Sequence, residues 1–363
     1  MWDVSIVGQL VDSGAFVSEN LELSGLTTLR VGGPARIVAE CDTKQVLVDV
    51  VRLLDSSRVP NLILAGGSNL VIGDDGFDGV VVRVSNGAVG LEENLVTAEA
   101  GAEWDRVVAR TVAAGLGGLE CLSGIPGSTG ATPVQNVGAY GVEVGSMLER
   151  VHLLDRRSGE THWVEPRALG LGYRTSVLKH SDDALVLAVE LKVNPDGLSE
   201  PLRYRELAAA LGAPEGRRLP SEQVRDAVLD LRRGKGMVLD PVDHDTWSAG
   251  SFFTNPVVTD AELAGVLSAI AARLGDVAVP QYSADGGTKL SAGWLIEKAG
   301  FEKGYPGEDA AARLSTKHAL ALTNRGAATS GDLLALARDV RDGVHAAFGV
   351  RLAPEPVTVG CTL

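Results

Sequence analysis

The chain has 363 residues, of which 45% are hydrophobic and 22% charged, and a formal net charge of −14 at pH 7. This composition is typical of a soluble globular protein, and at about 150 residues per domain the length predicts two or three domains. The acidic balance excludes a typical nucleic-acid binder, which presents a basic face, but it still allows an anionic small ligand where basic residues gather.

The three cysteines, Cys41, Cys121 and Cys361, are widely spaced and form no metal-binding pattern. Their odd number fits a reducing compartment. No apolar run is long enough to span a membrane, and the first four residues lack the basic start and apolar core of a signal peptide. We therefore expect a cytoplasmic protein with no metal, no nucleic-acid partner and no membrane partner. A monomer is expected because no long heptad pattern is present.

Short strands and helices alternate along the first half of the chain without a regular βαβ rhythm. A helix is expected at residues 43–54, with Thr43 as its N-cap, and another at 104–114. No G-x-G-x-x-G follows the first strand, which disfavours a Rossmann domain. Strands are expected at residues 35–39, 62–65, 80–84, 95–100, 151–154, 161–164 and 184–193, the fifth and sixth of them forming a hairpin.

Residues 123–141 form the most unusual stretch of the sequence. It is too rich in glycine and proline for a helix or a central strand. It is also longer than the 12–15 residues or so beyond which structureless loops are usually functional or disordered. Bulky residues such as Ile125 and Tyr140 argue against disorder. An ordered loop of this kind can present backbone N–H groups to an anion such as a pyrophosphate, although a rigid surface loop remains the alternative.

A second candidate anion site lies at residues 66–70, where a buried strand runs into Gly-Gly-Ser-Asn. Because Gly-Gly turns are common, an ordinary turn is the alternative here.

The second half of the chain changes character. Residues 194–250 contain five prolines and one clear helix, at 221–233, which indicates a connecting region. A further unit begins at Gly250. Its expected elements are a helix that starts with a capping box at 259–262, a helix at 291–299 capped by Ser291 and ended by Gly300, a strand at 319–322, a helix at 330–348 and an extended tail at 350–359.

Several ordered blocks together make the chain resemble the UDP-N-acetylenolpyruvoylglucosamine reductases. The blocks lie at residues 28–35, 66–70, 123–141, 172–176, 250–256 and 291–297, with Glu355 near the C-terminus. Any one block is a weak signal for this family, but all of them together in this order are specific for it. Residues 201–207 match the tyrosine-bearing loop that one type of this family carries.

The resemblance implies an α+β protein with an FAD-binding fold of the vanillyl-alcohol-oxidase (PCMH) type in two subdomains plus a third α+β substrate-binding domain. The first subdomain would span residues 1–86, with the tail 351–363 returning to it. The second would span 87–245, including the tyrosine loop and the connector near 194–245. The substrate-binding domain would span 246–350.

The resemblance also implies non-covalent FAD, with NADPH as co-substrate and UDP-N-acetylglucosamine enolpyruvate as substrate. Hydride would pass from flavin N5 to the terminal vinyl carbon, and a proton would add to the neighbouring carbon. The cofactor-binding residues would be Arg30, Val31, Gly66, Gly67, Ser68, Asn69, Leu70, Ser123, Gly124, Ile125, Pro126, Gly127, Ser128, Gly130, Gln135, Asn136, Gly138, Ala139 and Tyr140.

Three residues would carry the chemistry. Arg174 suits the carboxylate of the substrate, because a guanidinium forms two parallel hydrogen bonds with it and stays charged. Ser251 would donate the proton. A protonated Glu355 could donate a hydrogen bond to the developing enediolate. Outside these sequence blocks, Arg174 would be read as part of a surface ion pair and Ser251 as a turn or cap residue. Glu355 would be a solvated charge of the tail.

The substrate-binding residues would be Tyr204, which would cover the bound UDP-sugar, together with Lys235, Asn255, Gln281 and Lys303. Tyr204 as an ordinary helix start is the alternative, and Lys289 and Lys317 are candidates for merely solvated charges.

Two other functions fit parts of the sequence. A flavin oxidase of the same fold could act on a small alcohol or sugar, and such enzymes often tether the flavin through His or Cys. Cys121 lies just before the long loop, but a small buried side chain is the simpler interpretation. A non-catalytic nucleotide-sugar or flavin-binding protein would leave Ser251, Arg174 and Glu355 without roles.

Overall fold

The computed structural model describes residues 3–363, with side chains from residue 6 onward. The chain divides into two compact units. The first contains the residues up to Leu21, Ala35–Gly66 and Phe77–Gly234, and the second contains Glu22–Pro34, Gly67–Gly76 and Lys235–Leu363. The three-domain boundaries expected from the sequence stay a prediction.

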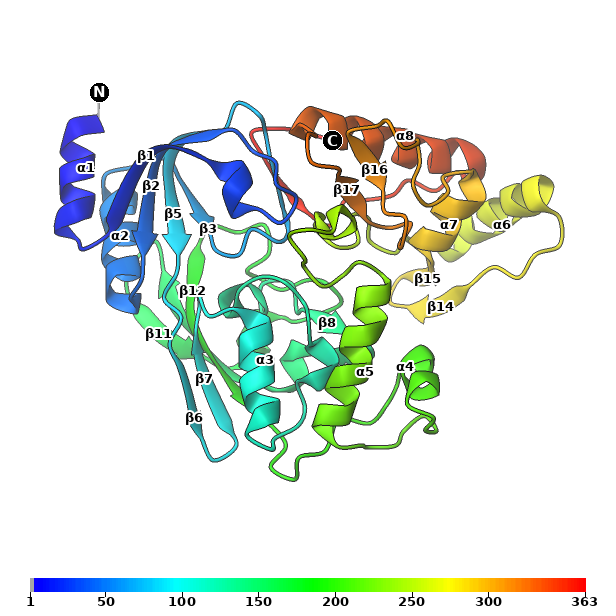
Figure 1. Cartoon of the computed structure of the whole chain (residues 1–363), viewed down its shortest axis with the longest axis horizontal. Helices are drawn as coiled ribbons and strands as arrows, with labels where there is room; N and C mark the ends of the chain where they lie inside the picture. The colour runs from blue at the N-terminus through cyan, green and yellow to red at the C-terminus, as the bar shows by residue number, and fades with distance from the viewer. Residues whose placement is uncertain (1–2) are drawn as a thin grey trace. The chain divides into compact units, whose positions relative to one another are not determined.

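The first unit contains two main sheets (Figure 1), besides the two-stranded pairing of β8 (Gly138–Ala139) with β9 (Val142–Glu143). The smaller sheet has the order β1-β2-β5-β3, and β5 pairs in parallel with both β2 and β3. The larger sheet has the order β11-β10-β12-β7-β6 and is antiparallel throughout. The strands are β1 (Phe16–Glu22), β2 (Pro34–Cys41), β3 (Asn61–Leu64), β5 (Phe77–Val84), β6 (Val89–Glu92), β7 (Leu95–Glu99), β10 (Leu148–Asp155), β11 (Thr161–Val164) and β12 (Ala184–Lys192).

Helices cover these sheets through their apolar faces. The helices of the unit are α1 (Asp3–Asp12), α2 (Lys44–Ser56), α3 (Trp104–Ala113), α4 (Arg205–Ala210) and α5 (Ser221–Gly234). The Thr43 side chain caps α2 by accepting a hydrogen bond from the N–H of Val46, as the sequence predicts. One apolar cluster joins α2 to the parallel strands, and a second joins α3 and α5 to the antiparallel sheet.

The second unit consists of three helices and short sheets. The helices are α6 (Asp260–Leu274), α7 (Ala292–Ala299) and α8 (Ser330–Phe348). The strands are β4 (Leu70–Ile72), β13 (Val257–Val258), β14 (Gln281–Ala284), β15 (Gly287–Leu290), β16 (Ala312–Leu314), β17 (Leu322–Asn324) and β18 (Val357–Val359). The tail strand β18 pairs in parallel with β4, with Val357 opposite Leu70.

The predicted ends of the helices in this unit are confirmed. A capping box at Thr259 and Glu262 starts α6, and the Ser291 side chain accepts from the N–H of Trp294 at the start of α7. Gly300 ends α7 in the left-handed conformation. Helix α8 has the predicted bounds.

The strand predicted at residues 319–322 is wrong. Residues 319 and 320 lie in a turn, which is closed by a hydrogen bond from the N–H of Ala321 to the carbonyl of His318. The strand β17 begins only at Leu322, where it pairs with β16. A short apolar run does not distinguish a strand from a buried turn.

No helix in the described part of the chain is long and apolar enough to cross a membrane.

Candidate active site

Residues 123–141 form an ordered loop, as the sequence predicts, and several main-chain contacts hold it. The N–H of Trp104 donates to the carbonyl of Gly127 at 3.0 Å, and the N–H of Thr129 donates to that of Ala102 at 2.8 Å. The Trp104 indole N–H donates to the carbonyl of Leu122 at 3.0 Å. The loop also contains a small hairpin, β8 (Gly138–Ala139) with β9 (Val142–Glu143).

Asp105 fixes the entry of this loop, a role that the sequence did not reveal. Its carboxylate accepts from the N–H of Gly124 at 2.6 Å and forms a bidentate ion pair with Arg225 at 2.6 and 2.9 Å. Burial by itself would raise the pKa of Asp105, but the Arg225 and Gly124 hydrogen bonds outweigh it, so the pKa is lowered. The carboxylate therefore stays ionised and keeps the loop in place.

The two glycine-rich segments meet at Gly66 and Gly127. A Cβ atom built on Gly66 would lie 2.6 Å from Cα of Gly127 and 3.2 Å from the backbone nitrogen of Ser128. Only glycine permits this backbone approach. The Ser128 hydroxyl is buried beside this contact, and no atom of the described residues forms a hydrogen bond with it. A buried hydroxyl in this state fits a site that takes a polar ligand such as the phosphates of FAD.

Replacing Gly66 with alanine is expected to weaken FAD binding by about tenfold or more, because the new methyl group forces the two segments apart. The measurement is the dissociation constant of FAD, followed by the quenching of its fluorescence. Gly8→Ala is the matched control, since nothing lies within 4 Å of a Cβ atom at this position in α1. An unchanged affinity in the Gly66 variant would contradict the role assigned to this contact.

Arg174 lies against the hairpin of the long loop. Its guanidinium donates to the carbonyl of Gly138 at 2.8 Å, and its backbone adopts a left-handed φ of +56°. Two side chains clamp this turn to the loop: Asn136 donates to the carbonyl of Gly172 at 3.1 Å, and Ser176 donates to that of Val134 at 2.5 Å. The structure therefore brings the predicted carboxylate-binding arginine to the predicted cofactor loop.

Tyr204 also lies at this loop. It stands at the N-cap position of α4, where its side chain caps no N–H group, and its ring packs edge-on against Tyr140 at 5.3 Å between centroids. A Cβ atom on Gly141 would lie 2.9 Å from Cβ of Arg203, which shows how closely the two segments pack. Tyr204 is thus a helix start and an exposed ring over the loop at the same time.

Arg30 and Val31 belong to a loop of the second unit. The Arg30 guanidinium lies 4.4 Å from the centroid of the Trp247 ring, and its backbone has a φ of +53°. The N–H of Thr28 donates to the carbonyl of Gly67 at 3.1 Å, so this loop adjoins the predicted cofactor turn. A Cβ atom on Gly67 would lie 2.0 Å from the carbonyl oxygen of Leu26.

Ser251 and Glu355 lie on neighbouring segments. The N–H of Glu355 donates to the carbonyl of Phe252 at 2.9 Å, and Phe253 bridges to Pro354 in antiparallel fashion. Phe252 and Phe253 are almost fully buried and anchor the segment directly after Ser251. The backbone segments that carry two of the three predicted catalytic residues therefore lie side by side.

The cofactor turn adjoins this pair of segments. The Asn69 side chain donates to the carbonyl of Glu355 at 3.4 Å, and the N–H of Val357 donates to the Asn69 carbonyl at 3.0 Å. Parallel pairing of β18 with β4 continues this contact.

The predicted substrate-binding residues lie in different surroundings. Lys235 begins the last segment of the second unit and is partly buried. The Asn255 oxygen accepts from the N–H of Ala292 at 2.9 Å and so also caps α7. Lys303 is exposed. Lys317 is more than a solvated charge, because it forms an ion pair with Asp243.

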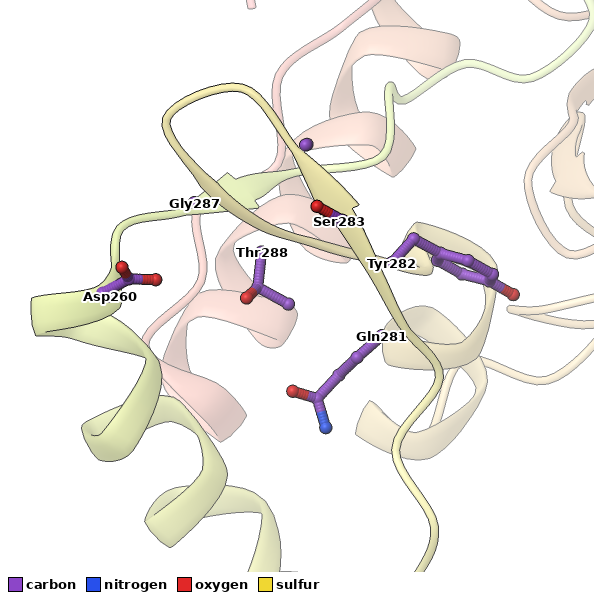
Figure 2. Close-up of a pocket in the computed structure, with 7 residues that line it drawn as sticks. Asp260, Gln281, Tyr282, Ser283, Gly287 and Thr288 are labelled. Carbon is purple, nitrogen blue, oxygen red and sulfur yellow. The ribbon is translucent and has the colours of Figure 1, made fainter.

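Gln281 lines an open polar cavity of about 460 Å³ beside the β14–β15 hairpin. Figure 2 shows Gln281 and Thr288 on the side of the hairpin that faces Asp260, at the start of α6, whereas Tyr282 points away from them. The cavity offers amide and hydroxyl groups, which suit a polar ligand.

Two of the cysteines are buried. Burial raises the pKa of Cys41 to about 12 and also raises the pKa of Cys121. The thiolate is the reactive form of cysteine, so neither sulfur is activated for a covalent link to flavin. The interpretation of Cys121 as a small buried side chain is confirmed.

Thiol labelling is expected to follow this burial. In the native protein at mildly alkaline pH, an aromatic disulfide reagent should modify only Cys361, which is partly exposed. Cys41 and Cys121 should react only after unfolding, because both sulfurs are buried away from the reagent. The measurement is the mass of each cysteine-containing peptide. Rapid labelling of Cys121 in the native protein would contradict its assigned position.

Comparisons with known proteins decide the family. The FAD binding domain family matches residues 35–165, and the C-terminal domain of UDP-N-acetylenolpyruvoylglucosamine reductase matches residues 240–359. A UDP-N-acetylenolpyruvoylglucosamine reductase of Nocardia farcinica is 67% identical over 98% of this chain and 92% of its own length. The chain belongs to the UDP-N-acetylenolpyruvoylglucosamine reductase family.

Other relatives agree with this membership. The reductase of Saccharopolyspora erythraea is 60% identical over 96% of this chain and 98% of its own length, and that of Mycobacterium tuberculosis is 57% identical over 98% and 99%. The solved reductase of Thermus caldophilus matches 95% of this chain and 99% of its own, with a TM-score of 0.65 and 26% identity.

The family membership confirms several predictions from the sequence. The protein is an oxidoreductase with an α+β, FAD-binding fold of the predicted type, and FAD is its cofactor. The individual site residues stay predictions.

Proposed function

We propose that the protein reduces UDP-N-acetylglucosamine enolpyruvate to UDP-N-acetylmuramate, using NADPH, as a step in peptidoglycan precursor synthesis. The observation that carries the proposal is that Ser251 and Glu355 are held on hydrogen-bonded segments beside Asn69, in a chain of this family. When bound, FAD supplies the hydride, which it takes from NADPH. The chain itself must bind the substrate carboxylate, stabilise negative charge and deliver a proton.

Arg174 is proposed to bind the substrate carboxylate. Its guanidinium already donates to the carbonyl of Gly138 through one nitrogen, and an arginine can form two parallel hydrogen bonds with a carboxylate. As hydride adds to the terminal vinyl carbon, negative charge moves onto this carboxylate. A fixed cation stabilises that charge without reorganisation.

Ser251 is proposed to give its hydroxyl proton to the carbon next to the carboxylate. The buried Phe252 and Phe253 anchor the backbone directly after it. Glu355, protonated, is proposed to donate a hydrogen bond to the developing enediolate. Addition of one hydride and one proton balances the reduction of the double bond.

The backbone N–H groups and the Ser128 hydroxyl of the long loop are proposed to bind the pyrophosphate of FAD, together with the turn at residues 66–70. The proposal is supported by the close approach of Gly66 to Gly127 and by the unsatisfied Ser128 hydroxyl. Tyr204 is proposed to cover the UDP-sugar, and Lys235, Asn255, Gln281 and Lys303 to contact it.

The function is tested by running the reaction with NADPH in D₂O and analysing the product by mass spectrometry and NMR. We expect UDP-N-acetylmuramate that carries deuterium on the lactyl carbon next to the carboxylate, because that carbon receives the exchangeable proton. Deuterium can also reach the lactyl methyl group, because the N5–H of reduced flavin exchanges with solvent, so a product without deuterium on the carboxylate-bearing carbon is the result that would contradict these roles. Absence of product, with reduced flavin consumed by oxygen, would favour a flavin oxidase.

A further inference from the structure

Asn324, at the end of β17, is almost fully buried and uses its whole side-chain amide within the second unit. Its Nδ2 donates to the carbonyls of Leu29 and Arg30 at 3.0 and 3.1 Å. Its Oδ1 accepts from the N–H groups of Gly326 and Ala328 at 2.8 and 3.0 Å. The amide therefore joins the Arg30 loop to the chain just before α8.

The same residue is also joined to the segment that leads to Ser251. The backbone N–H of Asn324 donates to the carbonyl of Trp247 at 3.1 Å, and the Trp247 ring lies under the Arg30 guanidinium. The Thr28 hydroxyl donates to the carbonyl of Ser248 at 2.7 Å in a buried position. Two contacts thus connect the Arg30 loop to residues 247–248, only a few residues before Ser251.

The Arg30 backbone makes this support necessary. Its φ of +53° is a conformation that an arginine holds only where surrounding contacts impose it. Asn324 supplies two of these contacts, at the carbonyls on either side of the Arg30 Cα, and Trp247 supplies a third at the side chain. Val31, the next residue, is buried.

We propose that Asn324 is a positioning residue for the reduction: it fixes the Arg30–Val31 loop for FAD and aligns that loop with the segment that carries the proton donor Ser251. This inference rests on the proposed function, since the cofactor role of Arg30 and Val31 and the donor role of Ser251 belong to it. Asn324 itself need not touch FAD or substrate.

Asn324→Asp tests the proposal with little change in shape. The new carboxylate keeps an acceptor for Gly326 and Ala328, but it loses both donors and places negative charge against the carbonyls of Leu29 and Arg30. We expect the dissociation constant of FAD to rise by about tenfold or more, because two buried carbonyls lose their partner. The visible spectrum of the bound flavin should also shift.

Lowering the pH should partly rescue this variant. A protonated aspartic acid regains one O–H donor, so the affinity of Asn324→Asp for FAD should increase as the pH falls, relative to the unsubstituted protein.

Trp247→Leu is the second variant, and it removes the ring under Arg30 without changing the Asn324 amide. It should weaken FAD binding in the same direction, and it decides the question if Asn324→Asp does not fold.

Thr323→Val is the matched control. Thr323 is the neighbouring residue of β17, is fully buried, and donates one hydrogen bond to the carbonyl of Arg313 at 3.0 Å, away from the Arg30 loop. The Thr323→Val substitution should lower the melting temperature of the FAD-free protein but leave the FAD affinity and the flavin spectrum unchanged.

The outcomes separate the proposal from the function on which it rests. One outcome is that Asn324→Asp and Trp247→Leu each lower the melting temperature, as Thr323→Val does, and still bind FAD with the affinity and spectrum of the unsubstituted protein. In that case Asn324 is only structural, and the positioning role is overturned while the proposed function stands. If the unsubstituted protein takes up no FAD, both are overturned.

Discussion

Replacing Ser251 with alanine is expected to slow reduction of the enolpyruvyl substrate by about a hundredfold to ten-thousandfold, the range that a positioned proton donor contributes. The substitution removes one hydroxyl and leaves the backbone contacts of Phe252 intact. Reduction of the flavin by NADPH, which needs no proton from Ser251, should proceed at the unsubstituted rate. Stopped-flow absorbance of the flavin measures the two half-reactions separately.

Ser268→Ala provides the matched control for Ser251→Ala. Ser268 is an exposed serine on α6 in the same unit, and its loss should change neither half-reaction. A Ser251 variant that reoxidises its flavin with substrate at the unsubstituted rate would show that another group delivers the proton.

Replacing Arg174 with lysine is expected to lower the rate of substrate reduction by about a hundredfold to a thousandfold, as loss of one preorganised donor to developing charge does. Lysine keeps the positive charge but cannot form two parallel hydrogen bonds with a carboxylate. It also cannot keep the contact to the Gly138 carbonyl in the same geometry. The rate constant for flavin reoxidation by saturating substrate is the quantity to measure.

Arg167→Lys is the control for Arg174→Lys. Arg167 lies on the surface of the same unit, paired with Glu165, and such exposed pairs contribute little. If Arg174→Lys changed only the substrate concentration needed for half-saturation and left the saturated rate intact, Arg174 would bind the substrate without stabilising the charge of the transition state.

Local signals predict the ends of several helices. Thr43, the capping box at Thr259 and Glu262, and Gly300 are helix ends whose side chains or glycine geometry act within a few residues. Such short-range chemistry can be read directly from the order of residues. The ordered state of residues 123–141 also followed from local composition, because their bulky side chains need a core in which to pack.

Contacts between distant segments could not be predicted in this way. The sequence indicates a strand at residues 319–322, yet the pairing of β17 with β16 sets the strand further along. Asp105 and Asn324 bear no motif, and each acts on a loop far away in the sequence, at Gly124 and at Arg30. Their importance arises from the fold, which alone brings a buried carboxylate or amide to a loop that needs it.

The family resemblance predicts the site residues, and the fold brings some of their segments together. The hydrogen bond from the N–H of Glu355 to the carbonyl of Phe252 brings together the segments of a serine and a glutamate about a hundred residues apart, as one reaction would require. The hydrogen bond from Arg174 to the carbonyl of Gly138 likewise brings Arg174 to the predicted cofactor loop. Neither pairing could have been inferred from spacing along the chain.

One bound FAD is proposed to pass reducing equivalents from NADPH to the enolpyruvyl substrate. The most direct measurement is anaerobic: the flavin absorbance is bleached with one equivalent of NADPH, and UDP-N-acetylglucosamine enolpyruvate is then added. We expect prompt recovery of the absorbance together with formation of UDP-N-acetylmuramate. A flavin that bleaches and recovers only when oxygen is admitted would contradict it.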